Sequence, residues 1–187
     1  VARLSVAGEL GYEINVPAVE HVSLYRTLKQ AGEELGLHEY GFNALLSLRL
    51  EKSFGIWSRE FTQAYTPAMA GMDRWLAFDK GDFVGRDAAR REKEEGGPRQ
   101  RLVTIQIAAE DADASGYEPI WQDGRRIGFV TSGGYGHCVN ESLALALVDR
   151  AQSSPGTNLS VHVVGEERAA KVIPPSPYDP TGQRMRA

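Results

Sequence analysis

The sequence predicts an α+β fold in which a mixed first part is followed by an all-β second part. In the first part, apolar residues recur at intervals of three and four, as they do on one face of a helix. The break Gly96-Gly97-Pro98 then interrupts the chain, and short apolar runs separated by Gly, Asp and Pro follow it. These runs are strand candidates: residues 102–107, 119–122, 126–131, 143–148, 159–164 and 169–173. Short strands at this density are typical of a small antiparallel sandwich or barrel.

The first part opens with two short strands over residues 5–16, joined by a glycine-rich turn. A strand so close to residue 1 leads us to expect that the natural polypeptide starts further upstream. Apolar residues spaced as on an amphipathic helix then run from Val22 to Leu35, and Gly36 ends this helix. A second helix is expected over residues 41–52, where the density of leucines indicates burial on more than one face.

The remainder of the first part is predicted to be less regular. Residues 53–72 form a loop with aromatic anchors, residues 75–78 form a strand, and residues 85–95 form a short charged helix. The Gly-Gly-Pro break gives the domain boundary. We therefore expect one domain over residues 1–97 and a second over residues 98–187.

Composition and charge argue against several classes of protein. With 42% hydrophobic and 25% charged residues, the chain has the composition of an ordinary soluble globular protein. The net charge of −4 gives no reason to expect nucleic-acid binding. No apolar run approaches the roughly 20 residues that span a bilayer, so no membrane association is expected. The single Cys138 has no partner for an internal disulfide, which favours a reducing compartment.

Two charged residues attract attention because their neighbours are apolar. Glu13 lies between Tyr12 and Ile14, and a carboxylate buried in such a strand needs a hydrogen-bonding partner. It is either a strand residue that faces solvent or pairs with an arginine, or an acceptor of two parallel N–H bonds from a planar amino-heterocycle. Arg49 lies in the leucine-rich helix, where Glu51 points elsewhere. It forms either a structural ion pair with a distant acid or a contact to an anionic ligand.

Other motifs favour structural roles. The segment from Thr131 to His137 is rich in glycine and follows a strand, but it lacks the full dinucleotide-binding fingerprint. A glycine-rich hairpin connection is therefore predicted in preference to a phosphate-binding loop. His137 and Cys138 are adjacent and the other histidines are scattered, so no metal site is expected. No Ser-His-Asp arrangement is proposed, because a triad is recognised by geometry.

Several short motifs occur in a fixed order along essentially the whole chain. They are Gly8-Glu9-Leu10-Gly11-Tyr12-Glu13, Ser47-Leu48-Arg49-Leu50-Glu51-Lys52, Thr66-Pro67, Asp79-Lys80-Gly81-Asp82-Phe83-Val84-Gly85-Arg86, Gly128-Phe129-Val130-Thr131-Ser132-Gly133-Gly134 and Pro177-Tyr178-Asp179-Pro180. This series resembles the C-terminal half of the glycine cleavage T-protein (aminomethyltransferase) family. The closing Tyr-Asp-Pro and the Leu-Glu-Lys after Arg49 make it most similar to the folate-binding part of dimethylglycine and sarcosine dehydrogenases and oxidases.

The resemblance implies the C-terminal portion of a T-protein-like folate-binding domain, followed by a small antiparallel β-barrel lobe. It implies transfer of a one-carbon unit from an amine substrate to tetrahydrofolate, with Glu13 holding the pterin ring and Arg49 lining the same site. The family's catalytic aspartate has no counterpart here and is expected in the upstream half of the same polypeptide, with FAD in a further upstream domain. This piece alone is expected to be inactive. The implied location is the cytoplasm of a bacterium or the mitochondrion of a eukaryote.

Three positions depart from the family pattern. Val6 stands where a tyrosine is usual, Leu46 where an acid is common, and Leu147 where an aromatic residue often occurs. These departures favour an alternative function, a non-catalytic folate-binding or scaffold module of the same fold. A third alternative is a demethylase of this fold that acts on a substrate other than glycine.

Overall fold

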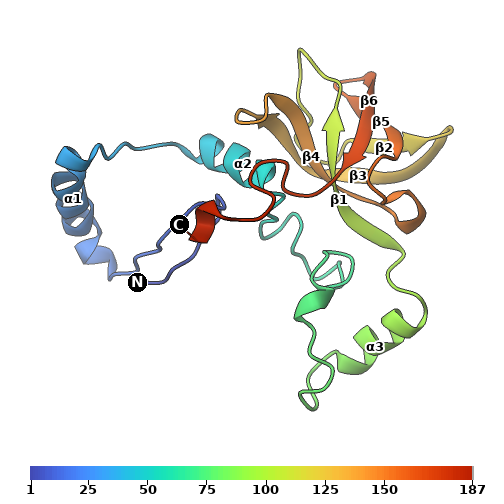
Figure 1. Cartoon of the computed structure of the whole chain (residues 1–187), viewed down its shortest axis with the longest axis horizontal. Coiled ribbons are helices and arrows are strands. Elements are labelled where there is room, and N and C mark those ends of the chain that lie inside the picture. The colour runs from blue at the N-terminus through green and yellow to red at the C-terminus, as the bar shows by residue number, and fades with distance from the viewer. Residues whose placement is uncertain (187) are drawn as a thin grey trace.

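The computed structural model describes residues 1–186, and its main regular unit is a closed β-barrel in the second part of the chain (Figure 1). The strands are β1 (Gln100–Ile107), β2 (Pro119–Gln122), β3 (Arg125–Gly136), β4 (Glu141–Asp149), β5 (Asn158–Val163) and β6 (Glu166–Ile173). They follow the order β1-β4-β3-β2-β5-β6, and every neighbouring pair is antiparallel. The predicted β lobe is confirmed, and of the two architectures left open it is the barrel. Closure pairs each strand on both sides and removes the exposed edges of an open sheet.

Apolar side chains from all the strands fill the barrel. Buried residues that represent the six strands in turn are Ile105, Ile120, Val130, Ala146, Val161 and Val172. β4 is buried on both faces, because Leu143 and Leu145 pack against Leu50 of the helix α2. This two-sided burial explains why β4 is an almost unbroken run of apolar residues. An antiparallel strand with one solvent-exposed face would alternate apolar and polar residues instead.

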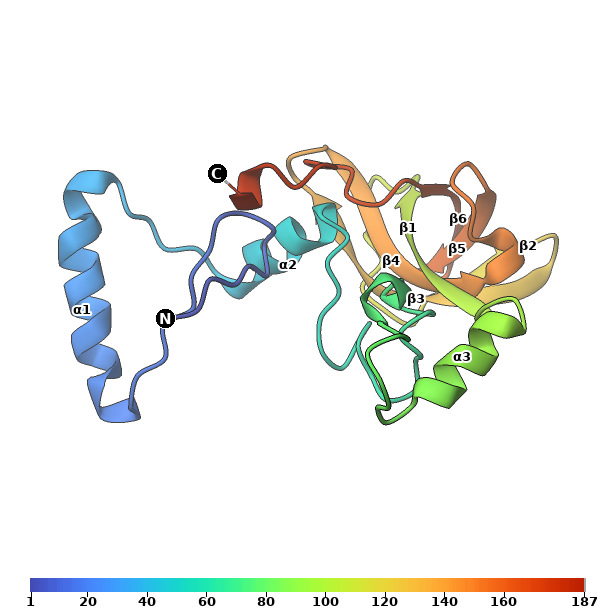
Figure 2. The same cartoon turned by 60° about the horizontal axis from the view of Figure 1, so that its bottom comes forward.

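The helices of the first part are α1 (His21–Gly32), α2 (Phe42–Glu51) and α3 (Arg86–Glu94). The first predicted helix appears as α1 followed by the 3-10 turn Glu33–Leu35, and Gly36 ends it in the left-handed conformation. α1 stands apart from the barrel and has no buried residue (Figures 1 and 2). α2 lies between the two, and its burial is confined to its C-terminal residues Arg49, Leu50 and Glu51.

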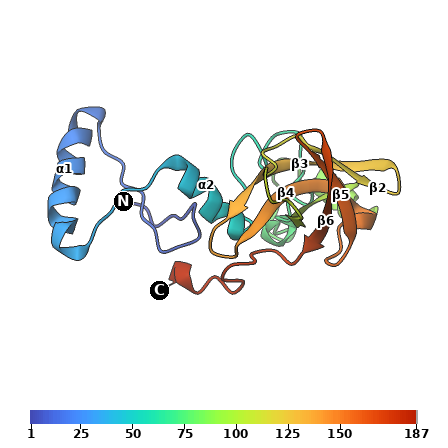
Figure 3. The ribbon, with the colours of Figure 1, turned by 90° about the horizontal axis from the view of Figure 1, so that it is seen from above.

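The prediction of two strands over residues 5–16 is wrong. The segment forms one isolated bridge between Ala2 and Glu13, with a bend over residues 6–10. Its alternating apolar residues meet no neighbouring strand, and alternation alone cannot supply the hydrogen-bonding partner that a strand requires. Figure 3 shows this segment lying between α2 and the C-terminal tail.

The strand expected over residues 75–78 is also absent. The chain makes a 3-10 turn over Asp73–Trp75 and continues in turns, and the side chain of Trp75 is largely exposed. The aromatic and aliphatic residues here have no sheet edge to join. The division of the chain into domains at residues 97 and 98 stays a prediction. Within residues 1–186, the helices are all too short or too polar to cross a membrane.

Candidate functional site

Glu13 lies on the surface of the segment that precedes α1. Its backbone exchanges two hydrogen bonds of 2.8 Å with Ala2, which fixes the chain direction at this point. The side chain is exposed, and its Oε1 accepts one long hydrogen bond of 3.4 Å from Nδ2 of Asn15. The expected burial of this carboxylate is therefore not seen, because the flanking Tyr12 is itself 63% exposed. Among the described residues, no arginine pairs with Glu13.

This arrangement leaves both carboxylate oxygens of Glu13 accessible to a ligand. A carboxylate with free lone pairs on two oxygens can accept two parallel N–H bonds from one planar group. The backbones of Gly11 and Leu4 lie close together just before Glu13, since a Cβ atom on Gly11 would lie 2.7 Å from the carbonyl oxygen of Leu4. The carboxylate is thus presented from a tightly folded loop.

Arg49, the second candidate, is buried near the C-terminal end of α2. Only 2% of the residue is exposed. Its Nη1 donates to the carbonyl oxygen of Phe54 at 3.0 Å and lies 3.4 Å from Oε2 of Glu60. Burial lowers the pKa of Arg49, and the negative charge of Glu60 opposes that shift. The structural ion pair is the alternative that the geometry displays, with Glu60 as the distant acid.

Glu60, which was not predicted as a functional residue, joins α2 to the barrel. Its Oε1 accepts hydrogen bonds of 2.5 Å from the hydroxyls of both Thr131 and Ser132, and its Oε2 accepts one of 3.0 Å from the backbone N–H of Ile56. Two consecutive strand residues reach one carboxylate because the β3–β4 register shifts between Val130 and Ser132. The apolar surroundings of Arg49 were the one signal that a buried acid had to exist.

The glycine-rich segment from Thr131 is part of a strand, which corrects the predicted hairpin connection. β3 continues to Gly136, and the turn to β4 covers residues 137–140. Glycine is needed inside this strand for close approach: a Cβ on Gly133 would lie 2.3 Å from the carbonyl oxygen of Ala114. Among residues 1–186, no hydrogen bond or ion pair joins Glu13 to Arg49, so the structure does not link the two candidates directly.

Lys52, directly after α2, is the centre of a second charged group. Its ammonium lies 3.2 Å from Oε1 of Glu9 and 3.3 Å from Oδ2 of Asp179, and the lysine side chain is 3% exposed. Arg184 donates from Nε to Oε2 of Glu9 at 2.7 Å. With Tyr178, whose ring faces both cations, these residues are called the Lys52 cluster below.

The carboxylates of the Lys52 cluster are held in their charged forms. Desolvation raises the pKa of Glu9, but hydrogen bonds from Arg184 and Lys52 outweigh it, and the net shift is downward. Desolvation likewise opposes the shift at Asp179, whose pKa is lowered by the backbone N–H groups of Arg184 and Gln183 and by Lys52. The ion pair with Glu9 raises the pKa of Arg184.

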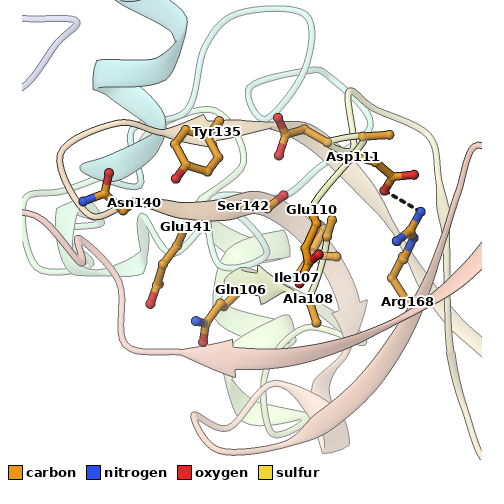
Figure 4. Close-up of a pocket in the computed structure, with 13 residues that line it drawn as sticks. Gln106, Ile107, Ala108, Glu110, Asp111, Tyr135, Asn140, Glu141, Ser142 and Arg168 are labelled. Carbon is orange, nitrogen blue, oxygen red and sulfur yellow. Dashed lines mark ion pairs between the residues drawn. The ribbon is translucent and has the colours of Figure 1, made fainter.

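A cavity at one end of the barrel includes neither candidate. Its volume is about 820 Å³, and it lies between the loop after β1 and the β3–β4 hairpin (Figure 4). Asp111 forms an ion pair of 2.7 Å with Arg168 on one side, and Asn140 and Glu141 lie on the other. Among the described residues, no cluster of His, Cys, Asp and Glu is arranged to bind a metal ion.

Comparison with known proteins identifies the family. Residues 1–80 match the family described as the GCVT N-terminal domain, and residues 100–179 match the glycine cleavage T-protein C-terminal barrel domain. The chain belongs to the glycine cleavage T-protein family. The crystal structure of the glycine cleavage system aminomethyltransferase T from Bartonella henselae superimposes with a TM-score of 0.84 at 25% identity, covering 97% of this chain and 49% of that one. The fold expected from the resemblance is therefore confirmed.

The relatives of known function include two kinds of enzyme. The mitochondrial dimethylglycine dehydrogenase of Mus musculus is 37% identical over 172 residues, which are 91% of this chain and 20% of that protein. The aminomethyltransferase of Caldanaerobacter subterraneus is 31% identical over 173 residues, which are 92% of this chain and 46% of that protein. The chain thus spans about half the length of the bacterial aminomethyltransferase and a smaller share of the dehydrogenase. Similarity to both classes confirms the predicted relationship.

Proposed function

We propose that this chain is the C-terminal part of a tetrahydrofolate-dependent one-carbon transferase that resembles aminomethyltransferases, and that Glu13 binds the pterin ring. The observation that supports this proposal is the exposed carboxylate of Glu13 on a tightly folded loop. Family membership and the aminomethyltransferases among the relatives support this reaction class.

The donor set fits the pterin group of tetrahydrofolate. A pterin presents a ring N–H and an exocyclic amino group side by side, and the two oxygens of Glu13 can accept both. Asn15 occupies only one lone pair of Oε1, through a long hydrogen bond. When bound, tetrahydrofolate supplies the nitrogen that accepts the one-carbon unit, while Glu13 contributes orientation.

We propose that Arg49 borders the same folate site from the side of α2. Its guanidinium is bound to Glu60 and to the carbonyl of Phe54, so its contribution is to keep α2 and the loop after it in place. The side chain has one buried nitrogen, Nε, without a hydrogen-bond partner among the described residues. Because this nitrogen is buried, we propose that Arg49 acts on the site by positioning α2 and not by a direct contact to the ligand.

We further propose that the other wall of the pocket, the catalytic aspartate and a flavin domain belong to upstream parts of the same polypeptide. The exposed apolar face of α1 supports this proposal. Val22, Tyr25 and Leu28 on that face are all exposed, so an upstream domain could pack against them. The bacterial relatives are about twice as long as this chain, so they are long enough to contain an upstream half of this kind. The amine substrate would bind there, and dimethylglycine is the candidate that the name of the mammalian relatives suggests.

A non-catalytic folate-binding or scaffold module is the second proposal. Val6 is 50% exposed beside the loop of Glu13, where the usual family tyrosine would offer a hydroxyl. Leu46 on α2 is half-buried, and Leu147 is buried in the barrel wall. Replacement of polar and aromatic groups by aliphatic ones removes a hydrogen bond and a stacking surface from any ligand near them.

The two proposals are separated by an assay of the full-length polypeptide. The protein is supplied with dimethylglycine, tetrahydrofolate and an artificial electron acceptor that reoxidises the proposed flavin, and the release of methylenetetrahydrofolate is compared with that of free formaldehyde. We expect folate-dependent product from the wild type and a strong decrease in Glu13→Gln, with Glu20→Gln as the control because Glu20 is also exposed. Folate binding without turnover would favour the module. Absence of both binding and turnover would contradict both proposals.

A further inference from the structure

The segment that carries Glu13 has little regular structure to hold it in place. Between residues 1 and 16 it forms only the bridge from Ala2 to Glu13 and a bend. Few of its side chains are buried. A binding carboxylate nevertheless has to be held near its productive position before the ligand arrives, because ordering it on binding reduces affinity. Other parts of the chain must therefore fix this segment.

Lys52 makes the most deeply buried contacts to the segment. Its Nζ donates to the carbonyl oxygen of Gly8 at 2.9 Å and pairs with Glu9 on one side and Asp179 on the other. These three acceptors match the three protons of an ammonium group, and the ring of Tyr178 lies 4.9 Å away. One buried cation therefore joins α2, the N-terminal segment and the C-terminal tail.

The fit at Gly8 is specific to glycine. Gly8 has a φ of 75°, and a Cβ atom added there would lie 2.5 Å from Cγ of Lys52. The backbone of Gly8 thus lies so close to the aliphatic part of Lys52 that only a residue without a Cβ atom fits. The segment cannot shift toward α2, and the hydrogen bond to the carbonyl oxygen prevents its moving away.

The C-terminal tail supports the segment from its other side. Arg184 bonds the second oxygen of Glu9, and Nη2 of Arg3 donates to the carbonyl oxygen of Met185 at 3.1 Å. Asp179 caps the last turn by accepting 3.0 Å bonds from the backbone N–H groups of Gln183 and Arg184. Figures 1 to 3 agree in placing the tail beside the N-terminal segment.

We infer that Lys52, together with Asp179 and Arg184 of the tail, forms a positioning group for Glu13. This inference rests on the proposed folate site. The group has two cations and two carboxylates, so its charges balance without recruiting Glu13, which stays free for the ligand. Loss of Lys52 would remove the cation that contacts both Glu9 and Asp179, together with the hydrogen bond to Gly8, and would release the segment from α2.

The test measures tetrahydrofolate affinity by calorimetry in the full-length polypeptide. Lys52→Met preserves the length of the side chain and removes its charge, and we expect binding about tenfold weaker, equivalent to about 1.4 kcal/mol. Because Lys52 acts through Glu13, the same substitution should change nothing further in a Glu13→Gln background. A general loss of structure would weaken binding by the same factor in both backgrounds.

Arg184→Gln is the variant that guards against misfolding, since the side chain of Arg184 is 58% exposed. We expect it to weaken tetrahydrofolate binding about threefold, in the range of an exposed charge pair. Arg125→Gln is its matched control, because Arg125 makes an ion pair of similar exposure with Asp149 on the barrel. That control should bind tetrahydrofolate as the wild type does.

Amide hydrogen exchange of Glu13, measured without folate, tests the positioning group independently of ligand. The hydrogen bond from the N–H of Glu13 to Ala2 should open more often in Lys52→Met and Arg184→Gln than in the wild type. Unchanged exchange together with unchanged affinity in both variants would overturn the inference. If the wild type binds no tetrahydrofolate, the proposed function fails, and the exchange result alone then decides whether the segment is held by Lys52.

Discussion

Oε2 of Glu60 lies 3.4 Å from Nη1 of Arg49, and both side chains are buried where α2 and the following loop meet the barrel. The pair connects the first part of the chain to the second, because the same carboxylate also accepts the hydroxyls of Thr131 and Ser132. A carboxylate buried in an ion pair is best tolerated when its remaining hydrogen-bonding capacity is used. Glu60 meets that condition with four donors.

Glu60→Gln is expected to destabilise the protein by about 3–5 kcal/mol, because it leaves the charge of Arg49 buried without compensation. Urea unfolding of the full-length polypeptide measures the change. Asp82→Asn is the control, since Asp82 pairs with Arg86 but its side chain is 97% exposed. We expect that control to cost below about 1 kcal/mol. If Glu60→Gln lowered the free energy of unfolding by no more than Asp82→Asn does, the structural role of the pair would be contradicted.

Gly128→Ala is expected to disrupt the barrel. A Cβ atom at this position would lie 2.0 Å from the carbonyl oxygen of Leu147 on β4, so the two backbones would have to separate. Overpacking of this kind costs about 1–3 kcal/mol or more. Thermal unfolding compares it with Gly41→Ala, where nothing lies within 4 Å of the added atom. Equal melting temperatures for the two variants would show that the strands are not so close.

Acidification is expected to open the Lys52 cluster. The pKa of Asp179 is lowered from its ordinary 3.8 and that of Glu9 from 4.5, so both are more easily charged in the folded state. Their stabilisation is therefore complete above these ordinary values and is lost as pH falls through the lowered ones. The stability difference between wild type and Asp179→Asn should shrink between pH 5 and about pH 3. A constant difference over that interval would refute the pairing.

Much of the fold follows from local patterns in the sequence. The alternation and turn residues after Gly97 predict all the barrel strands, and helical spacing predicts α1 and α2. Barrel closure was left open because it depends on which strands become neighbours, and that is not a local property. Residues 5–16 carry a strand pattern but no strand, because pairing needs a second chain segment that the pattern does not contain.

The candidate site was predictable only in part. The ordered motifs identify the family, and they single out Glu13 and Arg49 as candidates whose roles stay predictions. The acid that pairs with Arg49 could not be identified, since Glu60 lies in a turn without a sequence pattern of its own and is held by Thr131 and Ser132 of the distant strand β3. The role of Lys52 was equally hidden, because its partners Glu9 and Asp179 come from opposite ends of the chain.

The measurement that tests the central claim most directly is tetrahydrofolate binding to the full-length polypeptide with and without the Glu13 carboxylate. Calorimetry is performed on the wild type, Glu13→Gln and the exposed control Glu20→Gln. Replacing one acceptor oxygen by an N–H₂ donor turns a good contact to the pterin into a repulsive one, so we expect affinity to fall at least about tenfold in Glu13→Gln alone. Equal affinity in all three proteins would contradict the assignment of Glu13 as the pterin ligand.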